Sequence, residues 1–131
     1  MIQKRGLTPF VPKMIKRISY IRNFGVFQDY KRTGNIGDFK KLNIIYGWNY
    51  SGKTTISRLF NCLEKGELHK DYPNCEFEVT DQDDKKYSEN NLTIPGREIR
   101  VFNSDFIHKN LKWDGEAIDP ILLLGEESIE V

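Results

Sequence analysis

The stretch that decides the fold is Gly47-Trp48-Asn49-Tyr50-Ser51-Gly52-Lys53-Thr54. It fits the pattern G-x-x-x-x-G-K-[ST], which defines the phosphate-binding loop called the P-loop. Such a loop must follow a strand and open a helix. Residues 42–46, Leu42-Asn43-Ile44-Ile45-Tyr46, are apolar and β-prone, so they predict a buried strand before the loop. After the loop, the sequence predicts an amphipathic helix over 54–65.

The helix prediction depends on spacing. Ile56, Leu59, Phe60 and Leu63 recur at i, i+3, i+4 and i+7, which places them on one face of a helix. Gly66 is well placed to end that helix. Strand, loop and helix therefore follow one another in the order that the motif requires.

Each residue type in the loop suits the binding of a triphosphate. Inward-turned backbone N–H groups form an anion nest, and Gly47 and Gly52 let the backbone approach phosphates without a Cβ clash. Lys53 is expected to reach the β- and γ-phosphates, and the Thr54 hydroxyl is expected to ligate Mg²⁺. The predicted nucleotide-binding residues are Gly47, Trp48, Asn49, Tyr50, Ser51, Gly52, Lys53, Thr54 and Thr55.

Upstream of the loop, the pattern favours two strands. Residues 1–14 hold Gly6, Pro9 and Pro12 among basic residues and are expected to be a flexible lead-in. In the strand that begins at residue 15, Ile18, Tyr20 and Phe24 are expected on one side. A second strand is expected over 26–30, with a hairpin turn over 31–37.

Downstream of the helix, the pattern is mostly that of strands. Apolar and polar residues alternate over 75–80, which predicts a half-buried strand, and residues 81–86 predict a polar turn. Further strands are expected over 98–102 and 121–124. Ser104 is expected to cap a short helix that carries Phe106, Ile107 and Leu111. These elements indicate the α/β class, with a mixed sheet packed on the helix that follows the P-loop.

Composition excludes several classes of protein. The chain has 131 residues, with 38% hydrophobic and 30% charged residues, which is typical of a globular domain. Its longest apolar run, residues 121–124, is far too short for a membrane helix. Cys62 and Cys75 lack disulfide-framework or metal spacing and are expected to be reduced thiols in a cytoplasmic protein. His69 and His108 lack partners at metal-ligand spacing.

The net charge of +1 hides an asymmetry. Residues 1–60 hold 12 basic and 2 acidic side chains, whereas residues 61–131 hold 8 basic and 17 acidic ones. A basic half is compatible with an anionic partner. Alternatively, the two halves pack together and neutralise each other.

The chain resembles RecF/SMC-type ABC ATPases. The resemblance rests on Ile21-Arg22-Asn23-Phe24-Gly25-Val26-Phe27, and on a phosphate loop similar to G-x-N-G-S-G-K-T-T in which Tyr50 replaces the commoner glycine. It is similar in particular to RloC/PrrC-like anticodon nucleases and phage-defence ATPases. That likeness rests on residues 44–60, Val101-Phe102-Asn103-Ser104-Asp105-Phe106 and Leu123-Leu124-Gly125-Glu126-Glu127.

The resemblance implies that residues 15–131 form the N-terminal lobe of a P-loop NTPase head of the ABC type, and that the head is incomplete. ATP and Mg²⁺ are the implied cofactors. A second head, in a homodimer of the parent protein, and DNA or tRNA are the implied partners, with no membrane. The turn over 23–27 is implied to border the adenine, so Phe24 and Val26 are candidate contacts, with core strand positions as the open alternative.

The resemblance also implies what is missing. The signature motif of such ATPases is not found in this sequence. Their hydrolytic carboxylates are not found either, because Gly125 stands where an aspartate is expected to end a strand. ATP binding is then expected to gate an effector in the parent protein, and this chain alone is expected to bind nucleotide weakly without hydrolysis.

Two other functions remain open. A small P-loop kinase requires parallel strands joined by helices and a lid with arginines, and the strand-rich acidic half disfavours it. A non-catalytic DNA-binding or dimerisation module with a vestigial P-loop is favoured by the basic half.

Overall fold

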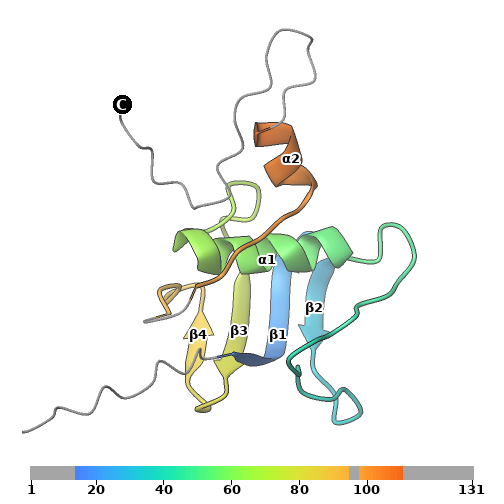
Figure 1. Cartoon of the computed structure of the whole chain (residues 1–131), viewed down its shortest axis with the longest axis vertical. Coiled ribbons are helices and arrows are strands. Elements are labelled where there is room, and N and C mark those ends of the chain that lie inside the picture. The colour runs from blue at the N-terminus through green and yellow to red at the C-terminus, as the bar shows by residue number, and fades with distance from the viewer. Residues whose placement is uncertain (1–13, 95–97, 111–131) are drawn as a thin grey trace, which may run out of the picture. The chain divides into compact units, whose positions relative to one another are not determined.

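A computed structural model describes residues 14–94 and 98–110. The chain divides into two compact units, one ending at Arg100 and one beginning at Val101. In the first unit, four strands form an antiparallel sheet in the order β2-β1-β3-β4 (Figure 1). The strands are β1 (Ile15–Phe24), β2 (Phe27–Lys31), β3 (Glu76–Asp81) and β4 (Lys86–Ser88), and the helices are α1 (Lys53–Lys65) and α2 (Ser104–Asn110).

Helix α1 lies across one face of the sheet (Figure 1). Its buried residues join those of β1 and β3 in one core. Burial of these apolar side chains supplies the main stabilising term for so small a unit. The core residues are Ile18, Ile21, Phe24, Leu59, Cys62, Leu63, Cys75, Phe77, Val79, Tyr87, Leu92 and Ile94.

Helix α1 confirms the periodicity in the sequence. Leu59 and Leu63 are buried, and Ile56 and Phe60 are half-buried against the same core. Gly66 ends the helix in the left-handed conformation, with φ of 70°, and its N–H donates to the Cys62 carbonyl at 2.9 Å. This is the glycine C-cap that the sequence predicts.

Strand β1 differs from its predicted alternation. Its pairing with β3 shifts between Ile15 and Arg17, and again between Ile18 and Tyr20. Each shift places one extra β1 residue opposite β3, as in a β-bulge, and reverses which side chains face the core. The second shift explains why Ile18 and Ile21 are both buried, and the prediction of Tyr20 on their side was wrong. Phe24 is buried as well, and it follows Asn23, whose φ is +49°.

Two predicted strands do not form. Residues 42–46 make no strand, and Leu42, Ile44 and Tyr46 are 82%, 90% and 90% exposed. Residues 98–102 make none either. Without these strands, the described sheet is antiparallel and not mixed, so the predicted mixed sheet was wrong for the described residues. Residues 42–46 form no strand because no neighbouring strand pairs with their backbone N–H and C=O groups. The predicted lead-in, apart from Met14, and the strand over 121–124 lie outside the described residues, as does Leu111.

The turns also differ in detail. The hairpin joins β1 to β2 through Gly25 and Val26, so the prediction of a hairpin turn over 31–37 was wrong. Lys31 is the last residue of β2, and residues 32–37 follow that strand. The second strand starts at Phe27 instead of Val26. Within the second unit, the predicted short helix forms as α2, which begins at Ser104. Its cap is the Asn103 side chain, which accepts from the Phe106 N–H at 3.0 Å, so the prediction of Ser104 as the cap was wrong.

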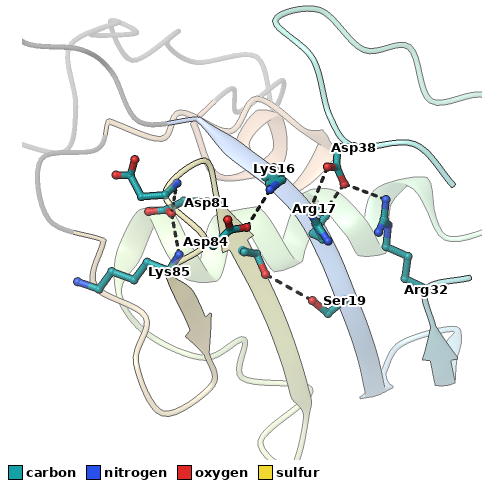
Figure 2. A network of polar contacts seen from close by, with 10 residues as sticks. Lys16, Arg17, Ser19, Arg32, Asp38, Asp81, Asp84 and Lys85 are labelled. Atoms are coloured by element: carbon teal, nitrogen blue, oxygen red, sulfur yellow. Dashed lines mark hydrogen bonds and ion pairs between the residues drawn. The ribbon is translucent and has the colours of Figure 1, made fainter. Parts of the chain in front are cut away.

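Polar pairs fix the loops at one end of the sheet (Figure 2). Lys16 donates to Asp84 at 2.8 Å, which ties β1 to the β3–β4 turn. Arg17 and Arg32 both donate to Asp38, at 3.1 and 2.8 Å, and so hold the loop after β2 against β1. The Lys16 contact joins the basic half of the sequence to the acidic half, which supports mutual neutralisation of the two halves.

Candidate functional site

The P-loop leads directly into α1. The helix begins at Lys53, and the Ile56 N–H donates to the Gly52 carbonyl at 2.9 Å as its first turn forms. The remaining N–H groups of this first turn lack intrahelical acceptors, as at every helix start. They and the positive end of the helix dipole therefore face the loop, which is the arrangement that binds anions.

Lys53 bends back over the loop. Its ammonium Nζ donates to the carbonyls of Gly47 and Trp48, at 2.6 and 2.7 Å. The two acceptors are neutral backbone carbonyls, and the Lys53 side chain that donates to them is exposed. A phosphate oxygen carries a negative charge, so it would attract the same ammonium more strongly than a neutral carbonyl does.

Backbone geometry explains the second glycine of the motif. Gly52 has a φ of +104°, a value that residues with a side chain rarely adopt. A Cβ atom at this position would lie 2.6 Å from the Phe27 ring. Gly52 is therefore required both by its own backbone and by the close approach of β2. Tyr50 also has positive φ, +64°, so the residue that replaces the commoner glycine sits in a glycine-like conformation.

A cavity of about 470 Å³ lies at the start of α1. That volume is within the range of small-molecule sites. The P-loop contributes Asn49, Tyr50 and Gly52, the helix contributes Lys53, Thr54, Thr55 and Arg58, the β1–β2 turn contributes Gly25 and Val26, and the α1–β3 connection contributes Tyr72. Gly47, Trp48 and Ser51 complete the loop without lining the cavity.

The two candidate adenine contacts have different surroundings. Phe24 is fully buried, and its ring packs against those of Tyr72 and Phe77 at centroid distances of 4.7 and 6.3 Å. Its side chain is therefore part of the core. Val26 is about half exposed and lines the cavity, so it offers apolar surface to a ligand.

Sequence reasoning missed two residues of the cavity, Arg58 and Tyr72. Arg58 follows Thr54 by four positions, so helical spacing alone places the two on one face. Tyr72 carries no local signal, because the chain returns to the cavity only after α1 has ended. The guanidinium Nη1 of Arg58 donates to the Tyr72 hydroxyl at 3.3 Å.

The charged residues of the described cavity lining are basic. Lys53 and Arg58 line it, and none of its described lining residues is acidic. In the part of the chain that the structure describes, no group of three or more His, Cys, Asp or Glu residues is arranged to hold a metal ion. The hydroxyl of Thr54 is the oxygen that the cavity offers next to Lys53, which suits Mg²⁺ only when phosphate oxygens supply further ligands.

Other basic residues of the first half are engaged elsewhere. Arg22 pairs with Asp29 at 2.9 Å and with Glu76 at 3.4 Å, and Arg32 pairs with Asp38. These ion pairs lie away from the cavity lining. Among residues 14–94 and 98–110, neither helix is long and apolar enough to cross a membrane.

Comparison with known proteins agrees with the motif. The family model of the AAA domain, AAA_13, matches residues 23–131, which include the P-loop, the β1–β2 turn and α1. No significant match was found among curated proteins or among solved structures. The matched region spans most of the sequence, and the chain therefore belongs to the AAA_13 family of ATPase-type AAA domains.

Proposed function

We propose that this chain is the ATP-binding lobe of an ABC/SMC-like ATPase. The observation that carries the proposal is the cavity at the start of α1, where Lys53, Thr54 and Thr55 meet the P-loop residue Asn49. Family membership supports it, since ATPase domains of this kind generally use ATP and Mg²⁺. The residues present fit both ligands: a cation and a helix N-terminus for the phosphates, and a hydroxyl for the metal.

Binding would exchange one set of contacts for another. The Lys53 ammonium leaves the carbonyls of Gly47 and Trp48 and moves to the β- and γ-phosphates. Loop N–H groups and the first turn of α1 cradle the remaining phosphate oxygens. Mg²⁺, when bound with the nucleotide, neutralises phosphate charge, and Thr54 would hold it. Thr55 lines the cavity next to these groups.

Calorimetry with ATP and Mg²⁺ tests the site. Lys53→Ala is expected to weaken binding by at least about tenfold, because it removes a charge-assisted contact to phosphate. Lys65→Ala removes the same charge from the far end of α1 and is expected to leave affinity unchanged. Equal affinities of wild type and Lys53→Ala would overturn the assigned site.

Hydrolysis is not expected from this chain alone. It requires an acidic residue for the metal and a residue that positions water, and the described lining supplies no carboxylate. In the parent protein we propose that ATP binding gates an effector, as the RloC/PrrC-like resemblance implies. A robust Mg²⁺-dependent ATPase rate from the isolated chain would contradict the expectation that this chain binds ATP without hydrolysing it.

We also propose that a second copy covers the nucleotide. Tyr50 lines the cavity and is 97% exposed, and the neighbouring Trp48 is 84% exposed. Large aromatic side chains in this position are typical of an interface. Light scattering is expected to show ATP-dependent dimerisation that Trp48→Ser with Tyr50→Ser abolishes and Tyr46→Ser retains. An unchanged mass with and without ATP would overturn the proposal.

The other two functions are less well supported. The described sheet is antiparallel, whereas a small P-loop kinase needs parallel strands joined by helices. The ion pairs of Lys16, Arg17, Arg22 and Arg32 reduce the charge available to DNA. Titration with duplex DNA at low and moderate salt tests the latter function, because a phosphate-contacting surface must show salt-dependent binding.

A further inference from the structure

The segment that leads into the P-loop presents two different sides. Asn43 and Ile45 line a second cavity, of about 430 Å³, and its described lining shares no residue with that of the P-loop cavity. Leu42, Ile44 and Tyr46 are not among its described lining residues and are 82%, 90% and 90% exposed. Side chains that alternate in this way are typical of an extended chain. The outer side of this extended segment is therefore an apolar row that faces solvent.

The backbone of the same segment has no partner in the described part of the chain. None of its N–H and C=O groups, from Leu42 to Tyr46, forms a hydrogen bond within residues 14–94 and 98–110. An extended segment with apolar side chains and an unpaired backbone can accept a further strand beside it.

Much of the lining of the second cavity is apolar and is fixed to the core. Ile15 of β1, Phe39, Phe60 of α1 and Ile99 line it, and all four are half-buried against the core. The ring centroids of Phe39 and Phe60 lie 6.5 Å apart, and the Phe39 N–H donates to the Lys16 carbonyl at 2.7 Å. An apolar side chain that entered the cavity would thus be buried against a preformed wall.

The charged residues of this lining include two lysines without an acidic partner. Arg100 pairs with Glu98 at 2.8 Å, so these two charges offset each other. Lys40 and Lys41 are exposed, and neither forms an ion pair in the part of the chain that the structure describes. The basic residues of β1, by contrast, all have acidic partners. Charge complementarity therefore favours an occupant that carries carboxylates.

We propose that the second cavity and residues 42–46 form a docking surface for an extended segment of a partner protein, in which an apolar run is flanked by acidic residues. The apolar run pairs with residues 42–46 as a strand and places side chains in the cavity. The acidic residues meet Lys40 and Lys41. The surface is separate from the P-loop cavity, so this inference goes beyond the proposed function and does not depend on ATP binding.

Selection from a library of random peptides tests the charge preference and supplies a probe. With wild type, the enriched peptides are expected to carry an apolar run with acidic neighbours. With the double variant Lys40→Glu and Lys41→Glu, the neighbours are expected to be basic, because the charge of the surface is reversed. The control double variant, Lys31→Glu and Lys70→Glu, alters net charge equally at exposed positions outside the lining and is expected to select as wild type does.

Fluorescence anisotropy with the most enriched peptide tests the apolar part of the surface. Ile44→Ser is expected to weaken binding about tenfold, because it removes an apolar side chain that the peptide would bury. Thermal unfolding of this variant is expected to match that of wild type, since Ile44 is 90% exposed. Ile36→Ser, outside the cavity lining, is the control and is expected to retain wild-type affinity. Wild-type affinity is also expected to fall as the salt concentration rises.

Several results would overturn the inference. One is a library that yields no binder, or the same peptides with wild type and with the charge-reversed variant. Another is unchanged peptide affinity in Ile44→Ser. Light scattering without ATP or peptide tests a different occupant: a dimer that Ile44→Ser abolishes would assign the surface to a second copy and not to a partner protein. None of these results bears on the ATP site, which Lys53→Ala tests separately.

Discussion

The side chain of Thr55 lies directly against Gly25. A Cβ atom at position 25 would come within 2.8 Å of Thr55 Cγ2 and 3.0 Å of Thr55 Oγ1. Gly25 belongs to the β1–β2 turn and Thr55 to the first turn of α1, where it is buried. The two walls of the cavity are therefore in contact, and the absence of a side chain at position 25 allows it.

Gly25→Ala is expected to disturb both stability and binding. Its φ of +58° costs an alanine about 1 kcal/mol, and the clash with Thr55 adds to this, for a total loss of about 1–3 kcal/mol in the free energy of unfolding. The turn must also move away from α1, so ATP affinity falls. Gly34→Ala, which meets nothing within 4 Å, is the control. Identical denaturation midpoints for the two variants would contradict the expectation.

Asp81 anchors the β3–β4 turn from a fully buried position. Its carboxylate accepts from the N–H groups of Asp83 and Lys85, at 2.9 and 3.0 Å, and from the Tyr87 hydroxyl at 3.2 Å. Figure 2 shows the backbone part of this network. Asp81→Ala is expected to cost about 3 kcal/mol or more, because the buried Tyr87 hydroxyl and two partly buried backbone N–H groups lose a charged acceptor.

The control for Asp81 lies in the same turn. Gln82→Ala changes an exposed side chain and is expected to alter the free energy of unfolding by less than about 0.5 kcal/mol. Tyr87→Phe removes the hydroxyl that donates to Asp81, and its cost in the free energy of unfolding is expected to fall between the other two, at about 1 kcal/mol. Urea denaturation measures all three values. Similar costs for Asp81→Ala and Gln82→Ala would show that the network contributes little.

Helix α1 and its caps were predictable from sequence because their signals are local. The apolar spacing of Ile56, Leu59 and Leu63, and a glycine at each end, specify a helix without knowledge of the rest of the fold. The P-loop residues were likewise found together, since they are contiguous. By contrast, the bulges in β1 leave no mark in the sequence, so Tyr20 was placed on the wrong face.

The remaining differences between the predictions and the structure depend on contacts between segments that are distant in the sequence. Residues 42–46 have the composition of a buried strand, but burial needs neighbours on both sides, and the described sheet ends at β2. Asn43 instead forms a local turn, exchanging hydrogen bonds with the backbone of Lys40 at 2.9 and 2.8 Å. Tyr72 lines the cavity only because the chain returns to it after α1, and no periodicity in the sequence predicts that path.

Cys75 gives the domain a pH dependence on the alkaline side. Burial raises the pKa of its thiol from 9.0 to about 11, and burial also raises the pKa of Cys62. Above pH 9 the unfolded chain releases the Cys75 proton while the folded chain retains it, so unfolding becomes more favourable. The stabilisation is complete below pH 9 and is lost between pH 9 and about 11.

The expected slope from one thiol is at most about 1.4 kcal/mol per pH unit. Urea denaturation across this pH range, under reducing conditions, is expected to show a shallower slope for Cys75→Ala than for wild type. Cys75→Ala also removes packing contacts, which lowers the free energy of unfolding by the same amount at every pH. This constant loss does not affect the slope, so the comparison of slopes reports on the thiol alone. Parallel curves for the two proteins would mean that the thiol titrates alike in the folded and unfolded states.

Thr54 is expected to matter only when metal and nucleotide are present together. The described lining of the cavity holds no carboxylate, so Mg²⁺ alone is expected to show no saturable binding. Thr54→Val keeps the side-chain shape and removes the hydroxyl. It is expected to weaken ATP binding on the order of tenfold with Mg²⁺ and to leave it unchanged with a chelator. Thr33→Val, in an exposed loop, is the control. Equal weakening with and without Mg²⁺ would assign the hydroxyl to phosphate and not to the metal.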